Sequence, residues 1–439
     1  MSLIQSSNTK KIRNVADVAK WRLCSGCGAC AAVCKKRAIN LLDVEDQGIR
    51  PVVNMADCSD CGSCLEVCPG ISLSHKPFDG RTIPELRSYW GPVLEVWGGY
   101  ATDPEIRFKG SSGGIVTALA LFCLTQMGID SVLQIGADPE KPLVNVPVFS
   151  RNRDQLVAQT GSRYSPAAPC AGLDTIEAID SHYVFVGRPC DVAGLRKAQS
   201  VNSVLASRVF LSISIFCAGT PSSKGTKTLL DRLNVKPQDV KEIRYRGCGW
   251  PGRTTVKLQG TNGRERQMSY EQSWGEILSR HVPLRCRLCP DGTGEFADIS
   301  CGDAWYKQTD FSDPGQSLVL VRTERGREVL RKAMQAGYVS LSLVGSSAVT
   351  ASQASLLNRR CQLWGRLLAM RMAHIPIPRF ERFSLFADWR HLSLSDKIRS
   401  IAGTLRRVMS RQLYRSSDFF PADTEAKNVV PTVLANTKT

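Results

Sequence analysis

Long hydrophobic segments are missing from this chain of 439 residues. The longest apolar run, at about residues 115–124, is far too short to cross a bilayer. Residues 1–20 contain no apolar h-region, so we expect no secretory signal peptide. There is no low-complexity block, and the composition is that of an ordinary soluble globular protein. These absences argue against a membrane-spanning or secreted protein and favour a cytoplasmic one.

Two familiar kinds of catalytic motif are also absent. We recognise no Ser/His/Asp triad and no phosphate-binding P-loop. Histidine is scarce, with five residues, and His182 precedes an apolar stretch where a structural role is expected. The sequence therefore gives no indication of triad hydrolysis or of P-loop nucleotide chemistry.

Cysteine, in contrast, is abundant, with 17 residues. Without a secretion signal, so many cysteines indicate reduced thiols and metal ligation rather than disulfides. Eight of them form two copies of the spacing C-x2-C-x2-C-x3-C, which is typical of bacterial ferredoxins with two [4Fe–4S] clusters. In that arrangement the fourth cysteine of each run ligates the other cluster. We assign one cluster to Cys24, Cys27, Cys30 and Cys68, and the other to Cys58, Cys61, Cys64 and Cys34.

Zinc is the alternative metal that paired C-x2-C units can bind. A zinc ion needs four ligands, usually from two separated pairs, and gives no reason for the third cysteine or the x3 step. Pro69 follows Cys68, as in ferredoxins, whereas Lys35 follows Cys34. Because that proline shapes a turn and is not a ligand, we keep the two-cluster assignment.

Positive charge is concentrated near the end of the chain. The net charge is +17, and residues 351–439 contain 15 Lys and Arg against 6 Asp and Glu. No recognised nucleic-acid motif accompanies these charges, so we expect no nucleic-acid partner. An anionic membrane surface or an acidic protein is the expected contact of this basic segment. A helix with apolar Ile398, Ile401, Leu405, Val408 and Met409 on one stripe is predicted there.

The order of segments predicts an α+β protein. We divide it into a leader (1–20), a two-cluster ferredoxin domain (21–74), a linker (75–92), an α/β layered domain (93–345) and a basic helical tail (346–439). In the α/β domain, strands are expected at 93–101, 131–135, 183–186 and 209–216, and helices at 114–127 and 193–198. Residues 242–268 are expected to form a β-rich insertion.

Four further cysteines form another possible ligand set, and two of them directly follow apolar strands. Cys190 and Cys217 each come just after a strand, and Cys286 and Cys289 form a C-x2-C pair. Sites gather at the carboxyl ends of strands in α/β domains, so these four side chains suggest a third [4Fe–4S] cluster. Free cysteines are also common as small buried hydrophobes, and spacing alone leaves both possibilities open.

The order of several motifs resembles the coenzyme F420 hydrogenase/dehydrogenase beta-subunit family. That family is related to divinyl chlorophyllide vinyl reductases and hydroxymethyl chlorophyll reductases. The matching segments are KGSSGGIVTALA, GSRYSPA, VGRPCDVAGLR, SIFCAGTPS, PLRCRLCPD and ADISCGDAW, in this order between residues 109 and 305. The resemblance implies an iron–sulfur flavoprotein in which Cys190, Cys217, Cys286 and Cys289 hold the third cluster and FAD lies beside it.

A turn rich in serine and glycine is the expected phosphate site of that FAD. Ser111, Ser112, Gly113 and Gly114 precede an apolar helix, and Thr117 lies in its first turn. A helix N-terminus offers unpaired N–H groups to phosphate. A serine N-cap with glycines shaping the turn is the simpler interpretation. The turn itself is not a G-x-G-x-x-G fingerprint, so no Rossmann nicotinamide site is predicted from it.

The resemblance also favours a second group of residues beside the flavin. Gly161 and Ser162 are expected to contact the cofactor, and Arg163 and Tyr164 to act as a cation and a stacking or proton-donating group. Asp298 and Asp303 are expected to form an acidic pair that relays protons, although an aspartate before a turn is commonly an Asx cap.

Taken together, these features predict an oxidoreductase that moves electrons between ferredoxin-type [4Fe–4S] clusters and FAD, to or from a small organic two-electron substrate. Its expected redox partner is ferredoxin or another electron carrier. The alternative is a non-catalytic electron-transfer subunit of a larger complex. The expected location is the cytoplasm, with a peripheral membrane contact as one role for the basic tail.

Overall fold

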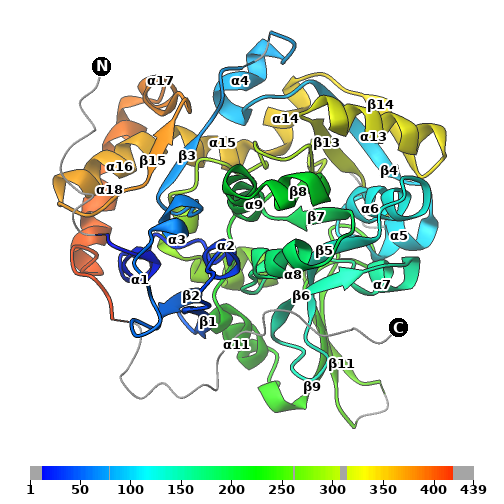
Figure 1. The fold of residues 1–439 in the computed structure, drawn as a ribbon, viewed down its shortest axis with the longest axis horizontal. Helices are drawn as coiled ribbons and strands as arrows, with labels where there is room; N and C mark the ends of the chain where they lie inside the picture. Colours follow the sequence, from blue (N-terminus) through cyan, green and yellow to red (C-terminus); the bar gives the residue numbers. More distant parts are fainter. Residues whose placement is uncertain (1–11, 79, 261–262, 307–313, 419–439) are drawn as a thin grey trace.

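The computed structural model describes residues 12–78, 80–260, 263–306 and 314–418. Its largest element is an eight-stranded mixed sheet (Figure 1). The strand order is β14 (Val339–Leu343), β4 (Glu95–Ala101), β13 (Ser317–Val321), β12 (Ile299–Asp303), β8 (Val209–Ile215), β7 (Tyr183–Gly187), β5 (Ser131–Ala137) and β6 (Asn145–Ser150). Neighbours from β12 to β5 run parallel, and the remaining pairs are antiparallel. The strands expected from the sequence are present, within one or two residues at most ends.

Helices cover both faces of this sheet with their apolar sides, as the alternation of strands and helices predicts. Helices α6 (Ile115–Gln126) and α13 (Glu324–Gln335) share one core with the sheet. Helices α8 (Leu173–Ala178) and α9 (Pro189–Val201) contribute to a core on the other side. Strand β13 is buried at all five positions, since it is central and covered on both faces.

The cysteine repeat forms a small unit with a matching internal repeat. Its helices α2 (Ala29–Ala32) and α3 (Ser63–Glu66) each follow a glycine in the left-handed conformation, Gly28 at φ 90° and Gly62 at φ 77°. Helix α1 (Val15–Lys20), the antiparallel pair β1 (Ile39–Val44) and β2 (Gly48–Val53), and β3 (Ser72–Ser74) complete the unit.

The β-rich insertion is present as a separate antiparallel sheet. Strands β9 (Val240–Arg244), β10 (Thr254–Leu258) and β11 (Glu265–Met268) pair in the order β11-β10-β9. The insertion lies at the bottom of the view in Figure 1, beside α11 (Ser223–Arg232).

The C-terminal segment returns to the N-terminal cysteine unit. It contains α14 (Ser347–Ser352), α15 (Ala354–Cys361), α16 (Leu363–Met372), β15 (Arg379–Glu381), α17 (Leu385–Arg390) and α18 (Leu394–Ser410). Strand β15 pairs in parallel with β3, and in Figure 1 the orange helices lie beside the blue α1. Apolar residues of both ends of the chain share one core.

Helix α18 does not bury the apolar stripe expected from the sequence. Its buried positions are Ser400, Thr404 and Val408, which face α16. Ile398 is 56% exposed and Met409 is 65% exposed. Most of the predicted stripe therefore lies beside the packing face rather than within it. The part of the expected tail after residue 418 lies outside the described residues.

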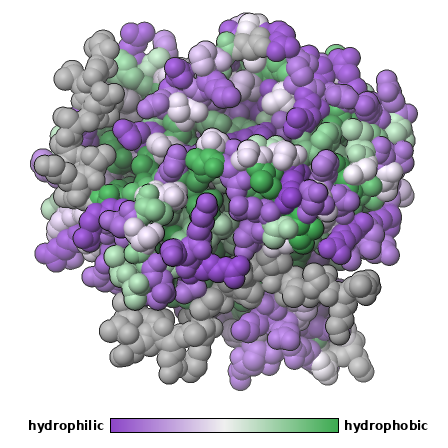
Figure 2. Space-filling model, viewed as in Figure 1, coloured by the Kyte–Doolittle hydropathy of each residue, from purple (hydrophilic) through white to green (hydrophobic). Residues whose placement is uncertain are grey.

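Among the described residues, no helix is both long enough and apolar enough to cross a membrane. The face seen in Figure 2 is mostly hydrophilic, with hydrophobic residues in small separate areas.

Gly113 should be a sensitive packing position, because it lies between two strands just before α6. A Cβ atom there would come within 2.7 Å of the Gly99 oxygen and 2.8 Å of the Ser317 nitrogen. We expect Gly113→Ala to lower the free energy of unfolding by about 1–3 kcal/mol. Gly275→Ala, where nothing lies within 4 Å, is the matched control. Urea unfolding of both variants tests this, and equal stability of the two would contradict it.

Candidate functional site

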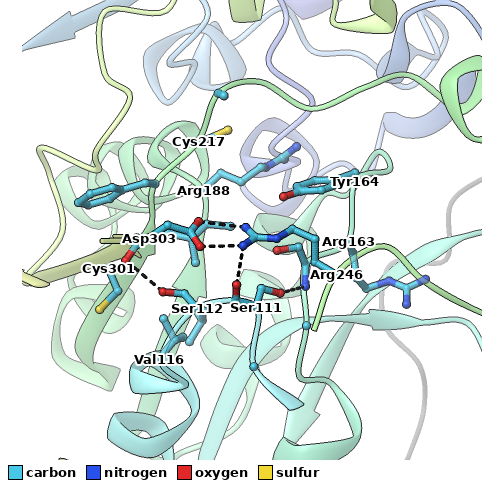
Figure 3. A pocket seen from close by; sticks show the side chains of 18 of the residues that line it. Ser111, Ser112, Val116, Arg163, Tyr164, Arg188, Cys217, Arg246, Cys301 and Asp303 are labelled. Carbon is cyan, nitrogen blue, oxygen red and sulfur yellow. Dashed lines mark hydrogen bonds and ion pairs between the residues drawn. The ribbon is translucent and has the colours of Figure 1, made fainter. Parts of the chain in front are cut away.

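A cavity of about 340 Å³ opens between the start of α6 and the ends of several strands. Strands β7, β8 and β12 end at its wall, which fits the tendency of α/β sheets to form sites at the carboxyl ends of their strands. The loop at residues 159–165 and residues from the insertion close the other sides. Figure 3 shows side chains from these segments converging on one space.

The N-terminus of α6 forms one end of this cavity. Its N-cap is Gly114, in the left-handed conformation at φ 77°, and no side chain caps the first turn. First-turn N–H groups are therefore available to an anion. Ser111 Oγ accepts a hydrogen bond from the Ser162 N–H at 2.5 Å, and Ser112 Oγ donates to backbone oxygens on the strand side.

Six of the seven predicted cofactor residues line the cavity. They are Ser111, Ser112, Gly114, Thr117, Gly161 and Ser162. Gly113 does not: its N–H donates to Ser317 Oγ at 2.9 Å, and it is buried between strands. Gly113 is therefore outside the cavity wall, and its small size lets the turn pack closely against Gly99 of β4 and Ser317 of β13.

Arg163 and Tyr164 both line the cavity, but their side chains make different contacts. The Arg163 guanidinium donates to Asn145 Oδ1 and to the Pro142 oxygen, and burial lowers its pKa. In Figure 3 it points away from Asp303, so its charge is used mainly by the β5–β6 hairpin. Tyr164 lines the cavity and packs against Trp274, with ring centroids 4.7 Å apart.

The expected acidic pair does not form. Asp298 accepts hydrogen bonds from Ser212, Arg196 and Thr323 and is not part of the cavity wall. Asp303 does line the cavity. The two carboxylates flank opposite ends of β12, so the prediction that Asp298 joins Asp303 in a proton relay is wrong.

The partner of Asp303 is Arg246, which the sequence did not single out. The Arg246 guanidinium donates to both Asp303 oxygens, at 2.9 and 2.7 Å, and to the Ser111 oxygen at 2.7 Å. Trp250 Nε1 also donates to Asp303, at 2.8 Å. This ion pair joins the insertion, the end of β12 and the serine turn. No spacing signal identifies Arg246, which is 57 residues from its carboxylate in the chain.

Aromatic rings that follow the insertion and β12 cover the same region. The Arg246 guanidinium lies 4.8 Å from the centre of the Tyr270 ring, and the Tyr270 and Trp305 rings stack at 5.8 Å. Burial, with the neighbouring Tyr164, raises the pKa of Tyr270. Tyr270 therefore stays protonated at neutral pH and can donate a hydrogen bond.

The four cysteines predicted to hold a third cluster lie close together. They are Cys190, Cys217, Cys286 and Cys289. Cys190 lies at the start of α9, Cys217 follows β8, and Cys286 belongs to α12 (Leu284–Arg287). Burial raises the pKa of Cys217 to about 12, and the charges of Cys286 and Cys289 contribute. Cys217 also lines the large cavity. We call these four residues the third cysteine set.

The ferredoxin-type cysteines fall into two groups. Cys24, Cys27, Cys30 and Cys68 line one small cavity, which brings the last cysteine of the second run to the first run. The charges of Cys61 and Cys58 act on Cys64, and the side chain of Cys61 is exposed. Across the described ranges, no three Cys, His, Asp or Glu side chains are grouped as ligands of a single metal ion would be.

The first group of thiols adjoins the third cysteine set. The buried Arg285 donates to the Pro69 oxygen at 2.9 Å, and its charge acts on both Cys24 and Cys289. Cys170, also buried, donates from Sγ to the Asp191 oxygen at 3.1 Å and from its backbone N–H to the Cys27 oxygen at 3.0 Å. The group with Cys58, Cys61 and Cys64 therefore comes first in space. The buried group with Cys24 follows it, then the third cysteine set, and then the cavity.

Comparisons with known proteins assign most of the chain to known families. The two parts of the family model "Coenzyme F420 hydrogenase/dehydrogenase, beta subunit" match residues 96–173 and 180–346, together more than half of the chain. A "4Fe-4S dicluster domain" model matches residues 23–70.

Curated relatives are distant in sequence. The F420-dependent formate dehydrogenase subunit beta of Methanocaldococcus jannaschii is 25% identical, over 57% of this chain and 62% of its own length. The coenzyme F420 hydrogenase subunit beta of Methanothermobacter thermautotrophicus is 26% identical, over 56% and 83%. The chloroplastic 7-hydroxymethyl chlorophyll a reductase of Oryza sativa is 25% identical, over 49% and 45%.

One solved structure shares the fold. A chain of the F420-reducing [NiFe] hydrogenase complex from Methanosarcina barkeri superposes with a TM-score of 0.50 at 22% identity. The match covers 64% of this chain and 94% of that one.

The Arg246–Asp303 pair should be strongly coupled, because the two side chains are only 3% and 16% exposed. We expect Arg246→Gln to lower the free energy of unfolding by about 3–5 kcal/mol, since it leaves a buried carboxylate without its cation. The double variant R246Q/D303N should recover about 1–3 kcal/mol of this loss. A double-mutant cycle by urea unfolding measures the coupling, and simple additivity of the two single effects would refute it.

Proposed function

Because the chain belongs to the coenzyme F420 hydrogenase/dehydrogenase beta-subunit family, we propose that it is an iron–sulfur flavoprotein oxidoreductase. It is an iron–sulfur protein of oxidoreductase type, related to subunits of F420-dependent hydrogenase and formate dehydrogenase. The proposed activity moves electrons between [4Fe–4S] clusters and FAD, to or from an organic two-electron substrate. The observation that supports it most is the position of Cys217, which belongs to the third cysteine set and also lines the cavity.

FAD suits the cavity because its polar and apolar parts have separate counterparts there. Gly114 and Thr117 offer the uncapped start of α6 to phosphate, and Gly161 and Ser162 offer a second stretch of backbone. When bound, FAD would interconvert two-electron hydride chemistry and single-electron transfer. Arg246 and Asp303 would hold the wall of the site rigid, and Tyr270 would supply a hydrogen bond to the substrate.

The cysteines suit [4Fe–4S] clusters because their thiols are crowded and buried. The pKa of Cys30 is raised well above its usual value by burial and by the charges of Cys24, Cys27 and Cys68. Such thiols ionise only if positive charge lies among them, which the irons of a cluster would supply. We propose the three ligand sets that the sequence predicts, including Cys34 with Cys58, Cys61 and Cys64.

The proposed direction is inward, from a ferredoxin or another carrier towards the organic substrate. The fused cysteine unit supports it, because its thiols adjoin the third cysteine set and add single-electron centres on the side away from the cavity. We also propose that the basic C-terminal segment contacts an acidic protein or an anionic membrane surface, since Arg399 and Arg406 are exposed on α18.

A second candidate is an electron-transfer subunit of a larger complex. The names of the relatives favour it, because several are subunits and the solved neighbour is a chain of a hydrogenase complex. Turnover of an organic substrate by the purified chain with an artificial donor would favour the enzyme. Activity that needs additional subunits would favour the second candidate.

Iron and sulfide analysis tests the third cluster. The anaerobically purified chain should contain about 12 iron atoms, from three [4Fe–4S] clusters. The double variant C286S/C289S should contain about 8, because the third set loses two ligands. A value near 8 that is the same in both proteins would exclude a cluster at Cys190, Cys217, Cys286 and Cys289.

Release of a yellow chromophore by heat or acid tests the flavin. We expect Val116→Trp, in the first turn of α6, to fill the cavity and reduce flavin content at least about tenfold, since a packed site cannot hold both groups. Val204→Trp, at a position 36% exposed, is the control. Flavin content, measured by absorbance, that stays at the wild-type level in V116W would show that the cofactor binds elsewhere.

A further inference from the structure

Five arginines gather over the loops of the third cysteine set, and we call them the arginine patch. They come from α12, α15, α16 and α18 and are Arg287, Arg359, Arg366, Arg407 and Arg411. Arg359 donates to the Cys217 oxygen at 3.1 Å and to the Ala218 oxygen at 2.6 Å. Arg366 donates to the Arg287 oxygen at 2.9 Å. The patch is therefore in direct contact with the segments that carry Cys217 and Cys286.

These arginines have no carboxylate partner among the residues that the structure describes. Their hydrogen bonds go to backbone oxygens, to Gln362 and to Thr404. Burial and the charges of Arg407, Arg359 and Arg287 lower the pKa of Arg366 to about 10. The five cations thus share one positive field that no carboxylate of the described residues compensates, which costs stability through self-repulsion.

Only part of the arginine patch serves to compensate the negative charge of the thiolates. Arg359 lies close enough for its charge to act on Cys289, so it offsets negative charge in the third cysteine set. Arg407 and Arg411 are exposed on α18 and make no hydrogen bond to a cysteine loop. Their charge faces outward, towards whatever approaches this surface.

A flat anionic membrane fits the patch poorly. Ile398 and Arg407 are nine residues apart on α18, which places them about 180° apart around the helix. A bilayer that receives the exposed Ile398 and Met409 would therefore leave Arg407 on the opposite side. A convex protein surface with clustered carboxylates can reach the patch without contacting those apolar side chains.

We propose that the arginine patch is the docking surface for a small acidic protein that carries single electrons. Docking there places the carrier beside Cys217, at the inner end of the row of cysteine sets, rather than at the exposed thiols of the ferredoxin-type unit. In each encounter one electron leaves the carrier and one is accepted at the third cysteine set, or the reverse, and no covalent bond or proton changes place. The proposal rests on the proposed function, because it needs a redox centre at those cysteines.

Charge reversal at the outer part of the patch tests the proposal. The probe is an oxidised, acidic plant-type [2Fe–2S] ferredoxin, and the measurement is its affinity for the full-length chain by calorimetry. We expect R407E/R411E to weaken binding at least about tenfold at low ionic strength, with the difference lost near 1 M salt, where the screening length is about 3 Å. The conservative variant R407K/R411K should bind within about twofold of the wild type. K236E/K241E makes the same change in net charge at two exposed residues near the start of β9 and should have little effect.

The R407K/R411K variant also maps the contact. A carbodiimide links lysine amines, but not arginines, to carboxylates, so cross-links from positions 407 and 411 to the ferredoxin should appear in this variant alone.

Equal loss of affinity in R407E/R411E and K236E/K241E would show a general effect of net charge and overturn the proposal. A loss confined to K35E/K36E, beside Cys34, would place docking on the ferredoxin-type unit and overturn it as well. Unchanged ferredoxin affinity with lost binding to anionic vesicles would identify a membrane instead.

Iron analysis separates a failure of this proposal from a failure of the proposed function. If the chain contains about 12 iron atoms and R407E/R411E binds ferredoxin like the wild type, the third cluster stands and the docking surface is wrong. If the chain contains about 8, the third redox centre is absent, and the docking proposal fails with it.

Discussion

Negative charge on crowded, buried thiolates is the constraint on which the rest of this structure depends. Burial raises the pKa of the thiol in Cys30, Cys68 and Cys217, so their thiolates need positive charge nearby. The fold supplies part of it with arginines. Arg285, buried between two sets, acts on Cys24 and Cys289. We propose that clusters supply the remainder. The same requirement explains why loops from distant parts of the chain meet at one end of the sheet.

The sequence predicts those features that depend on short spacing. The paired cysteine runs, four of the eight strands of the large sheet (β4, β5, β7 and β8) and the start of α6 are each set by residues within a few positions of one another. Pairings across the fold could not be predicted in this way. Asp298 and Asp303 look alike in sequence, yet Asp298 precedes β12, Asp303 is its last residue, and only Asp303 reaches the cavity. Its partner Arg246 comes from the insertion, whose position on the sheet no local pattern reveals.

The contacts of the C-terminal segment could not be predicted from the sequence either. Its composition indicates a basic helical region. The structure shows that this region packs on the ferredoxin-type unit and contacts the loops of the third cysteine set. Arg360 donates to the Pro290 oxygen at 3.0 Å and also pairs with Glu295. The family match ends at residue 346, so these contacts are made by a part of the chain outside it. This segment thus belongs to the framework of the proposed redox site.

The central claim is that one chain joins single-electron centres to a two-electron cofactor. Anaerobic reductive titration of the purified chain, followed by visible absorbance and electron paramagnetic resonance, tests it most directly. The account predicts uptake of about five electrons per chain, one for each of three clusters and two for the flavin. Flavin absorbance should bleach in the same titration in which the cluster signals appear. Uptake of about two electrons, with no flavin bleaching, would contradict the account and leave only the two clusters of the N-terminal unit.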